Sequence, residues 1–81
     1  MTRDEAQAWL VQMLLDAVRE TRYPSATQLD LIEASIPPAL IPDYFEVLIE
    51  KVRGDAYPSI SMVRRAQRVA AALPADEPDE D

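Results

Sequence analysis

The side chains with the most evident capacity for chemistry are two pairs of carboxylates. Asp16 with Glu20, and Glu46 with Glu50, lie four positions apart, which places the members of each pair on one face of a helix. Carboxylates on facing helices can bind divalent metals, but the dinuclear sites of helical bundles add histidines. The sequence contains neither histidine nor cysteine. We therefore interpret these pairs as solvent-facing charges and expect no metal, no cofactor and no catalytic residues.

A second candidate is a group of arginines late in the chain. Arg64 and Arg68 are one helical turn apart, and Arg65 is adjacent to the first of them. A helix, a short turn and an arginine-bearing second helix form the outline of a helix-turn-helix, so a nucleic-acid-binding module that uses these residues is one hypothesis. The net charge of −7 opposes phosphate binding. The alternatives are a protein-binding face or a solvated face whose arginines pair with nearby carboxylates.

The third candidate is apolar and lies in the first quarter of the chain. Its members are Ala6, Trp9, Leu10, Val11, Met13, Leu14, Leu15, Ala17 and Val18. On a helix they cover more than the single stripe that a surface helix buries. We expect Trp9 to lie in the core or in a dimer contact. Trp9 and Leu10 are candidates for partner binding, because aromatic residues are enriched at the centres of interfaces.

The elements that must position these residues are set by a tripeptide that occurs twice. Tyr-Pro-Ser occupies positions 23–25 and recurs 34 residues later at positions 57–59. The same offset aligns Leu14 with Leu48. Proline disfavours a helix at the residue before it, and a serine after it suits the N-cap of a new helix. We therefore predict a duplicated hairpin in which Ser25 and Ser59 cap the second helix of each half.

Periodicity and end signals predict four helices, over residues 3–21, 26–35, 42–53 and 59–73. We expect Gly54, the only glycine, to end the third helix at C′ in a left-handed conformation. Asp30 and Glu33 should point into solvent. The predicted fold is all-α: one compact four-helix domain over residues 1–75, built from two tandem hairpins at about residues 3–36 and 42–74.

The chain resembles small all-helical proteins of G+C-rich bacteria, on the residues Arg-Tyr-Pro-Ser at 22–25 followed by an acidic and apolar helix. This resemblance implies a helical fold and no activity.

The lack of asparagine and histidine, the single lysine and the frequent Ala, Arg, Asp and Pro also favour a bacterial protein, and we expect it in the cytoplasm. No apolar run reaches the length of a membrane span.

The negative charge is concentrated at the C-terminal end. Residues 76–81 contain five acids, and without them the net charge falls from −7 to −2. We expect a disordered acidic tail that adds solubility or folds back onto the arginines.

The sequence thus favours a small non-enzymatic module that binds another protein or a second copy of itself. Five residues are its candidate contacts: Trp9, Leu10, Arg64, Arg65 and Arg68. Binding of nucleic acid through the arginines is the alternative.

Overall fold

The computed structural model describes residues 1–74 of the chain. These residues form four α-helices and no strand, which confirms the all-α fold. The elements are α1 (Arg3–Glu20), α2 (Ala26–Ser35), the 3-10 turn η1 (Pro38–Leu40), α3 (Ile41–Arg53) and α4 (Ile60–Ala72). The predicted acidic tail lies outside the described residues. Up to Pro74, no helix has both the length and the apolar character that crossing a bilayer requires.

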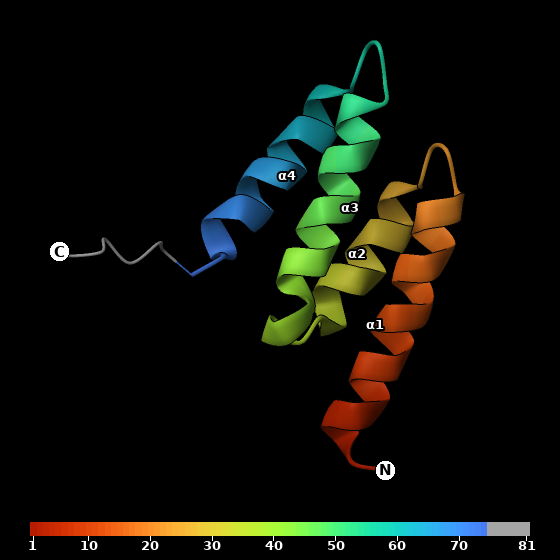
Figure 1. Ribbon diagram of the computed structural model, residues 1–81, viewed down its shortest axis with the longest axis vertical. Helices are drawn as coiled ribbons and strands as arrows, with labels where there is room; N and C mark the ends of the chain where they lie inside the picture. The colour runs from red at the N-terminus through yellow and green to blue at the C-terminus, as the bar shows by residue number, and fades with distance from the viewer. Residues whose placement is uncertain (75–81) are drawn as a thin grey trace, which may run out of the picture.

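The helices are arranged as two antiparallel pairs. Helix α1 packs on α2, α3 packs on α4, and α3 also contacts α1. Figure 1 shows the turn of each pair at the same end of the molecule, with α1 at one edge and α4 at the other. Helix α3 is therefore covered on two sides, whereas α1 and α4 each have an outer side.

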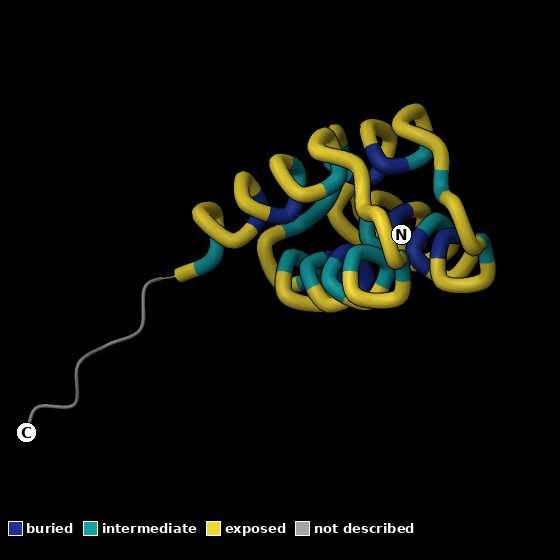
Figure 2. Tube along the Cα trace, turned by 90° about the horizontal axis from the view of Figure 1, so that it is seen from above, coloured by how far each residue is buried: buried dark blue, intermediate teal, exposed yellow. Residues whose placement is uncertain are grey.

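The core consists of ten buried apolar residues. They are Val11, Leu15, Val18, Leu29, Ile32, Tyr44, Val47, Leu48, Ala66 and Val69. Figure 2 shows that the buried segments lie on the inner sides of the helices and that much of each helix is exposed. Helix α4 contributes only an alanine and a valine to these ten residues, with Met62 partly buried against them, so polar contacts also matter for its position.

Both Tyr-Pro-Ser turns end in a serine that caps the next helix. The Ser25 hydroxyl accepts a hydrogen bond from the Gln28 N–H at 3.1 Å, and the Gln28 side chain accepts one from the Ser25 N–H at 3.0 Å. The Ser59 hydroxyl accepts from the Met62 N–H at 3.1 Å without a reciprocal bond, because a methionine has no side-chain oxygen. The starts of α2 and α4 are thus fixed by residues within one turn.

The prediction of a left-handed Gly54 is wrong. Gly54 has φ −79° and ψ −8°, a right-handed conformation, at the C-cap of α3. Its N–H still donates to the Glu50 carbonyl at 3.0 Å, so the helical hydrogen-bond pattern continues through this residue. A Cβ atom here would lie 3.2 Å from that carbonyl oxygen, so the absent side chain keeps the end of the helix free of a close contact.

Candidate interaction surface

Helix α1 carries apolar side chains on two different sides. One side supplies three fully buried residues of the core: Val11, Leu15 and Val18. On another side, Trp9 is 71% exposed, Leu10 45% and Met13 59%. We call Trp9, Leu10 and Met13 the outer face of α1. Exposed apolar side chains that gather on one helix are typical of an interaction site, whereas single ones are common on any protein surface.

A groove lies beside the outer face, between α1 and the link that joins the two hairpins. It encloses about 650 Å³. Its walls are Ala8, Trp9, Gln12, Met13 and Asp16 of α1, with Pro37, Ala39 and Leu40 of the link. The only charged group in this wall, the Asp16 carboxylate, is paired with Arg19 at 3.1 Å. A groove of this composition suits an apolar side chain of another molecule.

The repeat offset relates the outer face of α1 to a buried face of α3. A shift of 34 positions aligns Leu10 with Tyr44 and Met13 with Val47, and the two α3 residues are each 1% exposed. Helix α3 buries this face because the first hairpin lies against it. Among residues 1–74, no hairpin lies in the same way against α1. The outer face therefore has the composition of a packing surface and lacks the neighbour that covers its counterpart.

The arginines of α4 contact acidic residues of α2. Arg65 Nη1 lies 2.7 Å from Glu33 Oε2 and 2.9 Å from Asp30 Oδ1, and Arg68 Nη2 lies 3.4 Å from Glu33 Oε1. The Arg65 side chain is only 12% exposed. Arg64 is exposed and belongs to no ion pair in the described part of the chain. The structure thus does not bring the three arginines together as one free basic patch.

The prediction that Glu33 points into solvent is wrong. Its side chain is 26% exposed, and Oε2 also accepts a hydrogen bond from the Tyr44 hydroxyl at 2.5 Å. Glu33 lies one position after the buried Ile32, at the border of the apolar stripe of α2, where α3 and α4 can reach it. A sequence signal was present: the acids at 30 and 33 and the arginines at 65 and 68 have the same three-residue spacing on the second helix of each hairpin.

This cluster shifts the ionisation of two of its members. Burial raises the pKa of Tyr44 above its ordinary value, and the hydrogen bond and negative charge of Glu33 raise it further. Burial by itself lowers the pKa of Arg65, but its hydrogen bonds to Glu33 and Asp30 outweigh burial and raise that pKa. The cluster therefore holds a neutral phenol and a charged guanidinium together.

The raised pKa of Tyr44 predicts a loss of stability in base. The unfolded chain releases the phenol proton near the ordinary pKa of 10.0, whereas the folded protein retains it to higher pH. The contribution of Tyr44 is therefore fully present below about pH 10 and is lost progressively as pH rises above that value. Guanidinium unfolding measured between pH 8 and pH 11, as approximate limits around that pKa, should show a steeper decline for the wild type than for Tyr44→Phe. Parallel declines would show that Tyr44 does not contribute.

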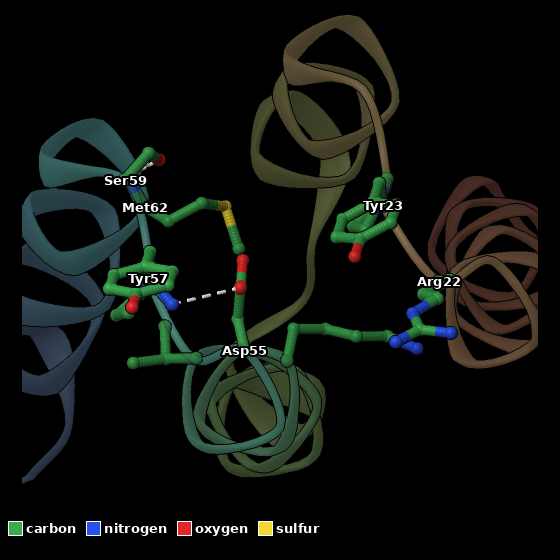
Figure 3. Close-up of a pocket in the computed structure, with 10 residues that line it drawn as sticks. Arg22, Tyr23, Asp55, Tyr57, Ser59 and Met62 are labelled. Carbon is green, nitrogen blue, oxygen red and sulfur yellow. Dashed lines mark hydrogen bonds between the residues drawn. The ribbon is translucent and has the colours of Figure 1, made fainter.

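The two Tyr-Pro-Ser turns together line a hollow of about 230 Å³, shown in Figure 3. Tyr23 and Tyr57 lie on opposite sides of it and are 68% and 91% exposed. The Lys51 ammonium donates to the Arg19 carbonyl at 2.8 Å, at the C-terminal end of α1, and the Asp55 carboxylate accepts from the Tyr57 N–H at 3.1 Å. Because these polar groups close a helix end and a turn, we interpret the hollow as the junction between the hairpins.

The described residues include no group of three or more side chains that could hold a metal ion. The carboxylates of Asp16, Glu20, Glu46 and Glu50 are all exposed. Comparison of the chain with family models, with curated proteins and with solved structures found no match. What the protein does is therefore inferred from its own residues, and the outer face of α1 with its groove is the strongest candidate site.

Proposed function

We propose that the protein is a non-enzymatic protein-interaction module that binds through the outer face of α1. The observation that carries this proposal is the exposure of Trp9, Leu10 and Met13 beside a groove lined mostly by apolar atoms. Fully burying one large apolar side chain contributes about 1.5–3 kcal/mol, so a partner that covers all three gains several kilocalories per mole. The absence of histidine and cysteine from the sequence also supports a role in binding rather than in catalysis.

The contacts of the arginines do not favour the alternative of nucleic-acid binding. Arg65 and Arg68 pair with Asp30 and Glu33, so part of their charge is neutralised within the protein. A phosphate backbone would have to compete with these carboxylates against an overall charge of −7. Arg64 lies on α4, away from the proposed surface on α1, and is a candidate for a separate protein contact, in which an exposed charge affects the association rate more than the affinity. The amino-acid usage of the chain, with one lysine and neither asparagine nor histidine, supports a bacterial origin, and we propose the cytoplasm as its location.

The proposal predicts that Trp9→Ala strongly weakens capture of a partner. Tryptophans at the centre of an interface often contribute 2 kcal/mol or more, so we expect binding to weaken by about 30-fold or more. Tagged wild type and Trp9→Ala should be compared in affinity capture from cells of the source organism, followed by titration with the purified partner. Tyr57→Ala is the matched control, because Tyr57 is an exposed aromatic residue in the turn between α3 and α4, and Figure 1 shows this turn at the opposite end of the molecule from the start of α1. A partner retained equally by Trp9→Ala and by wild type would refute the proposed surface.

A further inference from the structure

We infer that a partner of α1 is a second copy of the chain, with the two α1 helices packed antiparallel about a two-fold axis. This inference rests on the proposed function, because it assigns an occupant to the surface described above. It is carried by three features of α1: the spacing of its exposed apolar residues, the order of residue sizes along that row, and the charges at its two ends.

The exposed apolar residues of α1 form a continuous row. Ala6, Leu10, Met13 and Ala17 follow one another at intervals of four, three and four residues, and all four are exposed. We call this row the α1 seam. Alternating intervals of three and four are the a and d spacing by which two helices pack side by side. Trp9 borders the seam, so a helix that packs on it also covers part of the tryptophan.

The α1 seam is complementary to the α1 seam of a second copy that runs in the opposite direction. In an antiparallel pair centred between positions 11 and 12, Leu10 lies opposite Met13 of the partner subunit, and Ala6 lies opposite Ala17 of the partner subunit. Large residues thus meet at the centre, and small residues at both ends let the backbones approach. A two-fold interface requires this self-complementarity, since the same surface serves both subunits.

The charges at the two ends of the seam favour the antiparallel direction. The same register places Arg3 opposite Glu20 of the partner subunit, one turn beyond the alanine at each end. Within residues 1–74 neither Arg3 nor Glu20 forms an ion pair in the single chain. A parallel pair would instead place Arg3 beside Arg3 of the partner subunit, and the two Glu20 side chains would also meet. Like charges at these positions would destabilise the parallel pair.

A head-to-tail stack is a less suitable use of the same face. It would repeat the contact between hairpins by placing α1 of one copy on the outer side of α4 of the next. The repeat offset puts Val63 and Ala66 of α4 where α2 has Leu29 and Ile32. The smaller residues would leave part of the contact unfilled, and an open stack would not close into a defined assembly.

The first test measures the oligomeric state by sedimentation over a concentration series. We expect wild type to form a dimer as its concentration rises. Leu10→Glu should raise the dimer dissociation constant about 100-fold, because two symmetry-related leucines are lost from the centre of the interface. Val63→Glu is the matched control, because Val63 is 42% exposed and lies on α4. It should dimerise like wild type; a loss of association in Val63→Glu would indicate the head-to-tail stack and overturn the inference.

The second test fixes the direction of the helices, and the absence of native cysteine makes it selective. Ala6→Cys and Ala17→Cys proteins are oxidised separately and as a mixture in a glutathione buffer. The antiparallel pair predicts rapid disulfide formation only in the mixture, since the two positions 6 of a dimer lie about 17 Å apart along the axis, too far for a disulfide. Rapid cross-linking of Ala6→Cys with itself would establish a parallel pair and contradict the inference.

The two proposals fail in different ways. A wild type that stays monomeric at every concentration overturns the self-association but leaves the interaction function intact if Trp9→Ala still loses a captured partner. If the wild type is monomeric and Trp9→Ala changes no capture, both proposals are wrong. Circular dichroism of Leu10→Glu establishes that its helix content matches that of wild type, so that loss of the dimer is not loss of the fold.

Discussion

Replacing Glu33 with alanine is expected to lower the free energy of unfolding by about 2 kcal/mol, between the values for exposed and for fully buried ion pairs, because the Glu33 side chain is partly buried. Glu33 is the residue at which three helices meet. Its carboxylate accepts hydrogen bonds from Tyr44 of α3 and from Arg65 and Arg68 of α4. Without it, the buried phenol loses its strongest acceptor and the largely buried guanidinium of Arg65 loses its closest anion.

Asp30 limits the expected loss and supplies the control. It lies 2.9 Å from Arg65 Nη1, so this guanidinium keeps one carboxylate after the change at Glu33. Asp30 itself is exposed, and Asp30→Ala should lower the free energy of unfolding by only about 0–1 kcal/mol, as exposed ion pairs do. Urea unfolding of both variants measures the difference. Equal losses of unfolding free energy in the two variants would mean that the partial burial of Glu33 does not make its ion pairs stronger than the exposed pair of Asp30.

The position of α4 should depend on this cluster. Helix α4 contributes Ala66 and Val69 to the core, whereas α3 contributes a tyrosine, a valine and a leucine. The polar contacts of Arg65 and Arg68 with α2 therefore hold α4 against the first hairpin. Hydrogen exchange of Glu33→Ala should accordingly increase more in α4 than in α1, because the core contacts of α1 do not involve Glu33.

The ends of the helices in this fold can be predicted from the sequence. The ends of the helices depend on residues within one turn, such as Pro24 before Ser25 and Gln28 after it, so the predicted bounds are correct to within one residue. Gly54 is the exception, because a glycine after a helix permits the left-handed conformation without requiring it.

The packing of the helices, which decides the sides of each helix that are buried, cannot be predicted from the sequence in the same way. The apolar residues of the first helix predict a wide apolar surface, but they do not say which side meets α2 and which side stays exposed. That assignment depends on the position of each helix in the fold. Helix α3 lies between α1 and α4 and buries Tyr44 and Val47, whereas the aligned residues of α1, Leu10 and Met13, stay exposed. The prediction for Glu33 is wrong for the same reason, since its partners lie on other helices and far along the chain.

The second large effect on the free energy of unfolding is expected at Leu29. The offset of 34 residues aligns Leu29, which is buried, with Val63, which is exposed. Leu29→Ala should lower the free energy of unfolding by about 3 kcal/mol, because it opens a cavity in the centre of the core. Its counterpart Val63 lies on the outer side of α4 and is exposed, so Val63→Ala should lower that energy by less than about 1 kcal/mol. Urea unfolding of both variants at low protein concentration makes the comparison.

The low concentration matters because association would add stability to wild type and variants alike. A small Leu29 effect would mean that the core relaxes around the cavity, which would contradict close packing between the hairpins. A Val63 effect as large as that of Leu29 would mean that another surface covers the outer side of α4 even in dilute solution. In that case α4, and not α1, would carry the main contact of the protein with its partner.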